Sequence, residues 1–168
     1  GMAFGIDPKV VEQVTKAVCK VTDKPVIVKL SPNVTDIVEI AKAVEAGGGN
    51  GVSLINTLLG MAIDIHRRKP VLGNIYGGLS GPAVKPVALR MVHQVYKGVT
   101  IPIIGLGGIM TGTDAIEFMM AGAQAVQVGT ATMVDPTAIS RIAREMSEYV
   151  EQYNLNSITD IVGAVHQA

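Results

Sequence analysis

The stretch Ile101–Ala131, IPIIGLGGIMTGTDAIEFMMAGAQAVQVGTA, decides the fold. It opens with a short apolar run, Ile101–Ile104, and closes with a second one, Ala125–Val128. An alanine- and methionine-rich segment about one helix long, Thr113–Ala121, separates the two runs. Two buried strands at this separation predict a βαβ unit, in which the strands are parallel and their carboxyl ends carry the ligand-binding loops.

Glycine follows both predicted strands. Gly105, Gly107 and Gly108 come after the first strand, and Gly129 with Thr130 comes after the second. Glycine lets backbone N–H groups approach an anion without an intervening side chain, and the start of the next helix adds a favourable dipole. Each loop alone is equally compatible with a tight turn. Together they predict a phosphate site, because the last two loops of a (β/α)8 barrel commonly hold a phosphate.

The composition restricts the classes of protein. The 168 residues suffice for one domain, and with 48% apolar and 17% charged residues they suit strands covered by helices. Lys plus Arg and Asp plus Glu both number 14, aromatic residues make up 4%, and Trp is absent. These values argue against a nucleic-acid partner. No apolar run approaches the roughly 20 residues that span a bilayer, so we expect a cytoplasmic protein without membrane contact.

Cys19 is the only cysteine, which excludes an internal disulfide and a multi-cysteine metal site, and we expect no metal. It lies on a predicted amphipathic helix that starts at Asp7-Pro8, carries valines at helical spacing up to Val21, and is expected to cover a sheet. We interpret Cys19 as an inert thiol. The preceding segment, Gly1–Gly5, is predicted to be irregular.

The first predicted strand, Val26–Leu30, contains Lys29 near its carboxyl end. A lysine in such a run is costly unless it has an anionic or electron-rich partner, although it can also snorkel to the strand end. Thr35 or Asn33 can cap the helix that follows and stops at Gly47–Gly49.

The next strand, Gly51–Ile55, delivers Asn56 and Thr57 to the same sheet edge as Lys29. The Asn56 carboxamide offers donors and an acceptor to an amide- or carboxylate-bearing ring, although Asn-Thr is also a plausible turn. Leu58–Gly78 breaks the pattern as an extended excursion around the basic cluster His66–Lys69. Such a long insertion is usually functional and could cover the site or contact a partner, although a solvated charge cluster remains the default interpretation of His66–Lys69.

A further glycine-rich loop, Gly77–Pro82, opens a helix predicted over Ala83–Tyr96, in which His93 is interpreted as a surface or packing residue. Asp135-Pro136 starts a long helix that reaches Val150, and Ser157–Asp160 has capping-box character.

The chain therefore contains four predicted strand–helix units: Val26–Ala46, Gly51–Tyr96, Ile101–Ala121 and Ala125–Val150. Four units fill half of a (β/α)8 barrel. Since the first helix has no strand in front of it, we expect residues 1–168 to form the C-terminal half of a barrel, with the N-terminal half absent. The rival fold is a free-standing doubly wound parallel sheet.

Several motifs in order resemble the dihydroorotate dehydrogenase family, the flavin enzymes of pyrimidine synthesis. They are VKLSPN at Val28–Asn33, LINTLLGMAID at Leu54–Asp64, GGLSGPAVKP at Gly77–Pro86, IGLGGI at Ile104–Ile109 and VGTA at Val128–Ala131. INTLLGMAID and GGLSGPAVKP most resemble the class 1B catalytic subunit. The resemblance implies FMN as cofactor and a partner subunit, containing an iron–sulfur centre and FAD, that passes electrons to NAD.

The resemblance also implies roles for individual residues. Lys29 would reach the polar edge of the isoalloxazine ring, where a cation stabilises negative charge on reduced flavin. Asn56 and Thr57 would hydrogen-bond dihydroorotate or orotate. The remaining implied FMN contacts are Ile55, Gly81, Gly107, Gly108, Gly129 and Thr130.

The sequence also departs from the family pattern. The catalytic base of the family is a cysteine in a loop before the stretch that matches Gly1–Gly5, so no catalytic residue is expected in this chain. Cys19 is not that base, because it lies on the helix after the loop. We therefore expect the chain alone to bind FMN without oxidising dihydroorotate.

Two other functions stay open from the sequence. One is a different FMN barrel oxidoreductase of the dihydropyrimidine dehydrogenase kind, since Asn56-Thr57 is too small a signature to select the substrate. The other is a non-catalytic phosphate-binding or assembly module. Because open sheet edges invite pairing, we expect a homo-oligomer.

Overall fold

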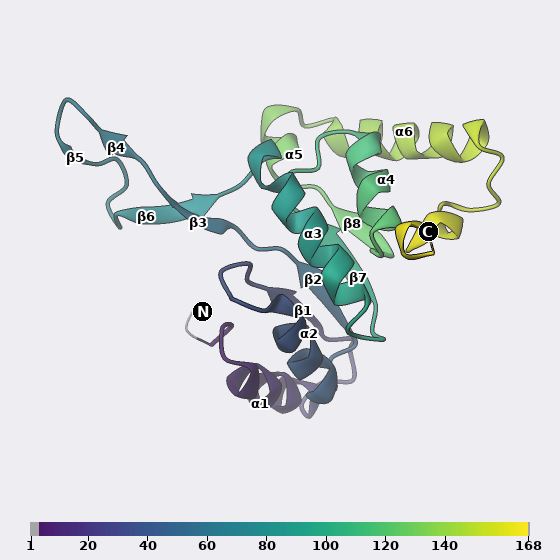
Figure 1. The fold of residues 1–168 in the computed structure, drawn as a ribbon, viewed down its shortest axis with the longest axis horizontal. Helices are drawn as coiled ribbons and strands as arrows, with labels where there is room; N and C mark the ends of the chain where they lie inside the picture. The colour runs from purple at the N-terminus through teal and green to yellow at the C-terminus, as the bar shows by residue number, and fades with distance from the viewer. Residues whose placement is uncertain (1–3, 168) are drawn as a thin grey trace.

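A computed structural model describes residues 4–167 of the chain, and the predicted irregular segment Gly1–Gly5 falls mostly outside this range. Four parallel strands form the central sheet, in the order β1, β2, β7, β8 (Figure 1). Their bounds are Ile27–Leu30, Gly51–Leu54, Ile103–Leu106 and Ala125–Gln127. The predicted α/β class and its four strand–helix units are confirmed, because the strands neighbour one another in chain order.

Helices cover one face of this sheet. They are α2 (Ile37–Ala46), α3 (Lys85–Tyr96) and α4 (Gly112–Met120), which follow β1, the β2 excursion and β7. The register places Leu30 beside Leu54, and Leu54 beside Gly105, on the covered face. A Cβ at Gly105 would lie 2.6 Å from the Phe118 ring of α4, so glycine here lets that helix approach the sheet. The core thus lies between the sheet and these three helices.

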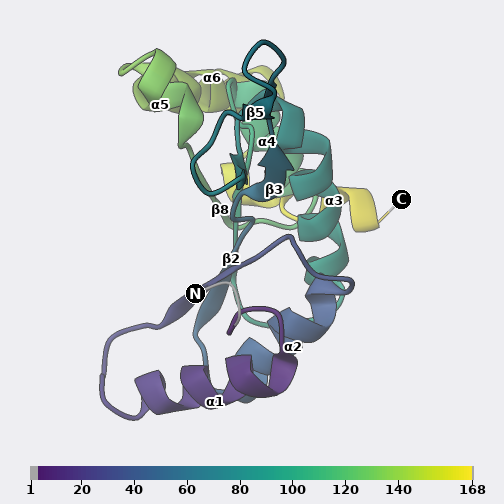
Figure 2. The ribbon, with the colours of Figure 1, turned by 90° about the vertical axis from the view of Figure 1, so that its left-hand side faces the viewer.

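The first helix, α1 (Pro8–Cys19), packs beside α2 and not on the sheet (Figure 2). Asp7 caps it as predicted, by accepting a hydrogen bond from Lys9 N at 2.9 Å. The expectation that this helix covers a sheet is wrong. Thr15 is buried against Gly47, at the end of α2, where a Cβ would lie 2.8 Å from Thr15 Cβ, so glycine at this position lets the two helices approach each other.

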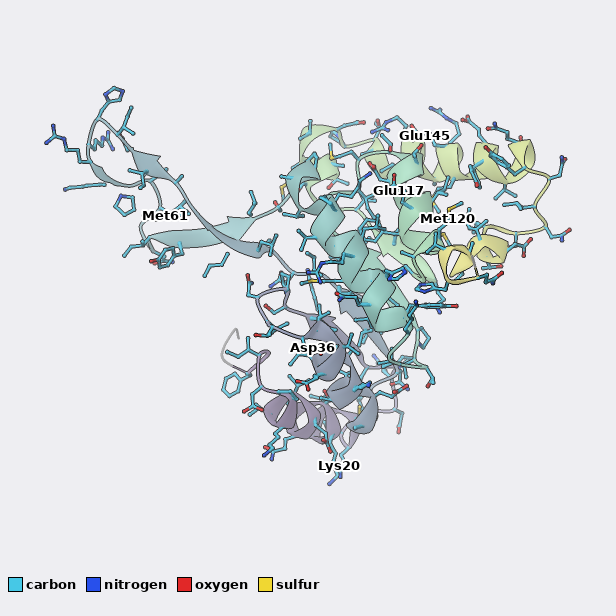
Figure 3. All side chains as sticks on the ribbon, in the orientation of Figure 1. Lys20, Asp36, Met61, Glu117, Met120 and Glu145 are labelled. Carbon is cyan, nitrogen blue, oxygen red and sulfur yellow. The ribbon has the colours of Figure 1, made fainter. Side chains whose placement is uncertain are left out.

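The excursion between β2 and α3 is an antiparallel arm that projects from the body (Figure 1). It contains β3 (Leu58–Met61), β4 (Ile63–Asp64), β5 (Lys69–Pro70) and β6 (Tyr76–Leu79). Met61 on β3 lies far from the helices (Figure 3), and its side chain is half exposed. The predicted excursion is therefore confirmed, with the basic cluster at its tip.

The C-terminal part contains α5 (Thr130–Val134), α6 (Ala138–Gln152) and the short 3-10 helices η2 (Ile158–Ile161) and η3 (Ala164–His166). A further 3-10 turn, η1 (Pro82–Val84), precedes α3. The predicted capping box at η2 is confirmed, with Ser157 and Asp160 as its members. The packing role predicted for His93 is also confirmed, because its ring stacks on that of His166 with centroids 4.1 Å apart.

One capping prediction is wrong. The cap of α2 is Asp36, whose carboxylate accepts from Val38 N at 2.8 Å, whereas Thr35 and Asn33 do not cap the helix. In the part of the chain that the structure covers, no helix combines the length and apolar composition required to cross a membrane.

Candidate functional site

A cavity of about 290 Å³ lies at the carboxyl ends of the four sheet strands. Every residue for which the sequence predicted a contact with cofactor or substrate lines it: Lys29, Ile55, Asn56, Thr57, Gly81, Gly107, Gly108, Gly129 and Thr130. These residues come from distant parts of the chain, and the parallel sheet brings them together because all of its strands end at the same edge.

Lys29 extends from the face of β1 that the helices leave uncovered. Its neighbours in the register on that face are Ser53 and Ile104, and its side chain is exposed at the cavity. Within residues 4–167 the ammonium group makes no hydrogen bond or ion pair. A lysine in this setting can provide a positive charge to a bound anion, so the structure agrees with either interpretation of Lys29.

The backbone holds Asn56 at the end of β2. Ile55 N donates to Leu106 O at 2.8 Å, and Asn56 N donates to Leu30 O at 2.9 Å, so both neighbouring strands bind this segment. Ile55 is buried and Asn56 is exposed. The Asn56 carboxamide therefore stands on a fixed backbone at the cavity, with its donors and acceptor available to a ligand.

The glycines after β7 fit closely into the structure. Gly107 and Gly108 have φ values of +130° and +78°, which favour glycine. A Cβ at Gly108 would lie 2.8 Å from both Gly81 O and Lys85 N, and one at Gly107 would lie 2.8 Å from Ala88 Cβ. The interpretation as a tight turn thus explains these two glycines without any ligand.

Gly129, after β8, has a different environment. Its φ of −114° is negative, so glycine is not required here by a left-handed φ, and no atom lies within 4 Å of the position that a Cβ would take. Neither a positive φ nor packing within residues 4–167 accounts for glycine here. A side chain at this position would instead enter the open space at the cavity, where a ligand can approach the backbone.

A hydroxyl pair joins two of the loops. Thr130 Oγ1 donates to Ser80 Oγ at 3.0 Å, which connects the start of α5 to the loop before η1. Within the described residues, neither η1 nor α5 has an N-cap side chain hydrogen-bonded to its first turn. Ser80 is not among the predicted contact residues, although its position next to Gly81 in the motif GGLSGP was an available signal.

An ion-pair cluster behind the loops was also missed. Lys85 Nζ lies 2.6 Å from an oxygen of Asp114 and 2.9 Å from one of Glu117. The second oxygen of Asp114 accepts from Met110 N and Thr111 N, both at 2.9 Å. Lys85 and Asp114 therefore fasten the start of α3 to the loop that contains Gly107 and Gly108.

Two members of this cluster, Asp114 and Lys85, have shifted pKa values. Burial alone would raise the pKa of the Asp114 carboxyl, but hydrogen bonds from Lys85, Met110 and Thr111 outweigh it, so the pKa lies below its ordinary value. The hydrogen bonds to Asp114 and then Glu117 raise the pKa of Lys85 above its ordinary value. Asp114 and Lys85 are therefore both charged throughout the neutral range.

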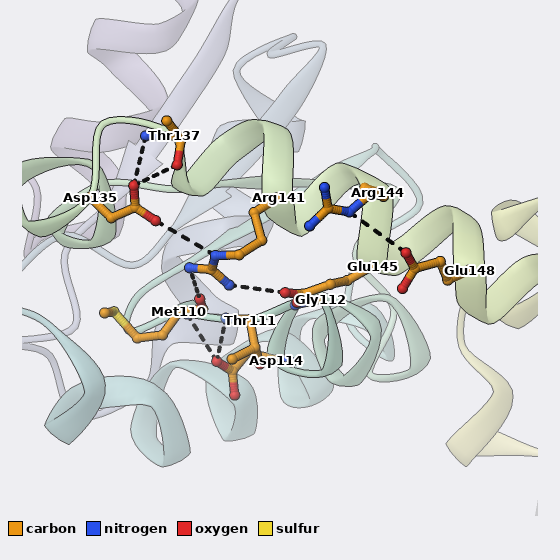
Figure 4. A network of polar contacts seen from close by, with 10 residues as sticks. All are labelled: Met110, Thr111, Gly112, Asp114, Asp135, Thr137, Arg141, Arg144, Glu145 and Glu148. Atoms are coloured by element: carbon orange, nitrogen blue, oxygen red, sulfur yellow. Dashed lines mark hydrogen bonds and ion pairs between the residues drawn. The ribbon is translucent and has the colours of Figure 1, made fainter.

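A second network fastens α6 to the same loop (Figure 4). Arg141 donates to Met110 O at 3.1 Å and pairs with Glu145 at 3.0 Å. A Glu145 oxygen also accepts a hydrogen bond from Gly112 N. Hydrogen bonds from the Gly112 backbone and Arg141 lower the pKa of Glu145. Two networks thus hold the loop after β7, one through Lys85 of α3 and one through Arg141 and Glu145 of α6.

The structure places Cys19 away from the cavity. Its Sγ lies 3.4 Å from Gly48 O, in the turn that leads into β2, whereas the cavity lies where β2 ends. Across the described range no group of three or more His, Cys, Asp and Glu side chains is arranged to hold a metal ion.

The fold and the site together define a class of protein. It is an α/β protein whose parallel strands run in chain order, with glycine-rich loops around a ligand cavity at their carboxyl ends. Barrel enzymes that hold phosphate-bearing ligands have this organisation.

The chain belongs to the dihydroorotate dehydrogenase family, whose model matches residues 1–150. This confirms the predicted family and, with it, the barrel type of the fold.

Three relatives are named dihydroorotate dehydrogenase B (NAD(+)), catalytic subunit. The protein of Desulforamulus reducens is 63% identical over 166 residues, 99% of this chain and 55% of the relative. That of Alkaliphilus metalliredigens is 61% identical over 165 residues, 98% of this chain and 55% of the relative. That of Phocaeicola vulgatus is 57% identical over 165 residues, 98% of this chain and 54% of the relative. The chain thus spans about half the length of these relatives.

Proposed function

We propose that this chain forms the FMN- and substrate-binding part of a dihydroorotate dehydrogenase, which oxidises dihydroorotate to orotate in pyrimidine biosynthesis. The observation that carries the proposal is the cavity at the sheet edge, lined by all nine predicted contact residues. The name shared by the relatives favours dihydroorotate over a dihydropyrimidine as the substrate.

The residues at the cavity fit FMN. A phosphate needs N–H donors that side chains do not obstruct, and Gly129 lines the cavity with open space at its Cβ position. Thr130 adds a hydroxyl from the first turn of α5. Gly81, Gly107 and Gly108 also line the cavity, where they expose backbone atoms without side chains. Ile55 provides an apolar surface for a flat ring.

FMN, when bound, supplies the acceptor for a hydride from the substrate. Lys29 would provide a cation that stabilises negative charge on that acceptor. Asn56 and Thr57 would hold the substrate ring through their amide and hydroxyl groups. Each of these groups stands on a strand end fixed by backbone hydrogen bonds, which limits reorganisation during the reaction.

We also propose that proton removal depends on a residue outside this sequence. The family resemblance assigns it to a cysteine upstream of Gly1, and Cys19 lies at the opposite end of β2 from the cavity. This chain alone should therefore bind FMN without oxidising dihydroorotate.

The proposed partner is an electron-transfer subunit with an iron–sulfur centre and FAD, which delivers the electrons to NAD in the cytoplasm. The name of the relatives, a catalytic subunit, is compatible with such a partner. We further propose a homo-oligomer, because the arm exposes Ile63, Ile65 and Val71 by 60% or more. Sedimentation of a monomer at micromolar concentration would contradict the homo-oligomer.

A titration of the purified chain with FMN, followed by quenching of flavin fluorescence, tests the proposed cofactor. Gly129→Asp places a carboxylate in the open space at the cavity and should weaken FMN binding by at least about tenfold, through repulsion of the phosphate. Gly73→Asp is the matched control, since Gly73 on the arm also has no atom within 4 Å of its Cβ position. Saturable wild-type binding that is unchanged in Gly73→Asp and lost in Gly129→Asp supports the proposal. Absence of wild-type binding, or equal affinity in both variants, contradicts it.

A further inference from the structure

Asn33 connects two loops at the edge of the cavity. Its Nδ2 donates to Thr57 O at 3.0 Å, and its Oδ1 accepts from Leu59 N at 2.9 Å. The carboxamide thus pairs with the backbone as a neighbouring strand would. Its orientation is decided by these partners, because the flipped amide would place oxygen against the Thr57 carbonyl and nitrogen against the Leu59 N–H.

The loop that carries Asn33 is itself ordered by a local turn. Ser31 Oγ accepts from Asn33 N at 3.2 Å and from Asn33 Nδ2 at 3.4 Å. Because Asp36 caps α2, the Asn33 side chain is not needed there and is free to reach the loop after β2. This pairing spans 24 to 26 residues of sequence, so it is a tertiary contact and not a turn.

The two bonds act on the residues proposed to bind substrate. Asn56 is fixed from one side by its N–H bond to Leu30 O, and the Asn33 carboxamide fixes the Thr57 carbonyl from the other side. The Thr57 side chain also packs closely on the backbone of Gly78 in the arm. Asn33 therefore determines how the backbone of Asn56-Thr57 leaves β2 and enters the arm.

We propose that Asn33 is a positioning residue for substrate binding: it holds Asn56 and Thr57 in the orientation in which they bind the ring of dihydroorotate or orotate. This inference rests on the proposed function, since it assigns Asn33 a role at that same site. Loss of the carboxamide frees the Thr57 carbonyl and the Leu59 N–H, so the side chains of Asn56 and Thr57 lose their fixed direction.

The test compares Asn33→Ala with Asn50→Ala. Asn50 Oδ1 accepts from Val26 N at 2.8 Å near the amino ends of β1 and β2, so its removal also breaks a tertiary bond from side chain to backbone, away from the cavity. Three quantities are measured. The orotate Kd is measured by calorimetry on the FMN-loaded protein. The FMN Kd and the hydrogen-exchange rate of the Leu59 amide are measured on the free chain. Asn33→Ala should raise the orotate Kd about tenfold or more, keep the FMN Kd within about twofold, and accelerate exchange at Leu59. Asn50→Ala should change none of the three.

A third variant, Asn33→Asp, separates the two hydrogen bonds. Its carboxylate still accepts from Leu59 N but sets an oxygen against Thr57 O, so Leu59 should stay protected while orotate binding weakens, with partial recovery as the pH falls and the new acid protonates. An orotate Kd unchanged in Asn33→Ala, with wild-type binding intact, overturns the positioning role and leaves the proposed function standing. A wild-type protein that binds FMN but no orotate overturns the proposed substrate, and the inference with it.

Discussion

The loops after β7 and β8 both look like glycine loops in the sequence, yet the structure builds them differently. The loop after β7 has two glycines at positive φ, packed against Gly81, Lys85 and Ala88, and two polar networks hold it. The loop after β8 has Gly129 in open space, and Met133 in the following helix is 88% exposed.

This difference distinguishes glycines that the fold requires from a glycine that we propose contacts a ligand. Gly107 and Gly108 are required by the backbone and its neighbours, so their replacement should damage the fold before it affects a ligand. Gly129 has neither a positive φ nor a close neighbour at its Cβ position within the described residues, so its replacement should affect a ligand more than the fold. The following predictions test this division, in order of decreasing effect on stability.

Gly108→Ala should give the largest loss of stability. Its Cβ would lie 2.8 Å from Gly81 O and Lys85 N, at a φ of +78°, so backbone strain and overlap should together lower the free energy of unfolding by about 3 kcal/mol. Urea unfolding followed by circular dichroism measures this value. Gly129→Ala is the matched variant and should change it by less than about 0.5 kcal/mol. Equal losses in the two variants would remove the distinction between the loops.

Lys85→Met should be the next most disruptive change. It leaves the carboxylates of Asp114 and Glu117 without their cation, so we expect a loss of about 1–2 kcal/mol, since the cluster is half buried. The same urea experiment measures the loss. Arg144→Ala is the control, because the Arg144–Glu148 pair is exposed and should contribute less than about 0.5 kcal/mol. If Lys85→Met costs no more than Arg144→Ala, the cluster does not fasten the loop.

The pH dependence of stability should report the Asp114 contact. Because the fold lowers the pKa of Asp114, the contribution of its charge is present above the unfolded pKa of about 3.9 and is lost as the pH falls through the lower folded value. The stability difference between wild type and Asp114→Asn should therefore stay near about 1 kcal/mol from pH 7 to about pH 4 and begin to shrink only below that pH. Urea unfolding of both proteins between pH 7 and 3 tests this. A difference that does not vary over this range would show that the Asp114 charge does not stabilise the loop.

Thr130→Val should have the smallest effect on stability. It removes the 3.0 Å hydroxyl bond to Ser80 while the volume of the side chain is retained, which should cost about 0.5–1 kcal/mol. Affinity for FMN should fall about tenfold because the variant lacks the hydroxyl that would turn from Ser80 Oγ to donate to the phosphate. Thr132→Val provides the comparison, since the Thr132 hydroxyl donates to Gly129 O at 2.7 Å at the start of α5. A Thr130→Val protein with wild-type FMN affinity would remove Thr130 from the proposed phosphate contacts.

The sequence predicts much of this architecture because the signals are local. Apolar runs such as Ile101–Ile104, followed by glycine, identify the strands and the edge at which their loops gather. The order of the strands follows from their parallel pairing. Gathering of the nine predicted residues at one cavity follows from the same topology, although their roles stay predictions.

The missed features depend on contacts between distant side chains. Lys85 meets Asp114 across 29 residues, and Arg141 meets Met110 across 31, and no local pattern encodes either pairing. The cap of α2 was assigned to Thr35 or Asn33 because three neighbouring polar residues can each cap a helix, and only the backbone decides among them. Likewise, the spacing of the valines in α1 predicts an apolar stripe, but it does not indicate which element packs against that stripe.

The most direct test of the central claim is an NMR titration of the isotopically labelled chain with FMN, which follows the backbone amide shifts. We expect the largest changes at the amides of Gly129 and Thr130, smaller changes at Gly107 and Gly108, and none at the arm residue Gly73. Shift changes confined to the arm, or spread evenly over the chain, would contradict a phosphate site at the carboxyl end of β8.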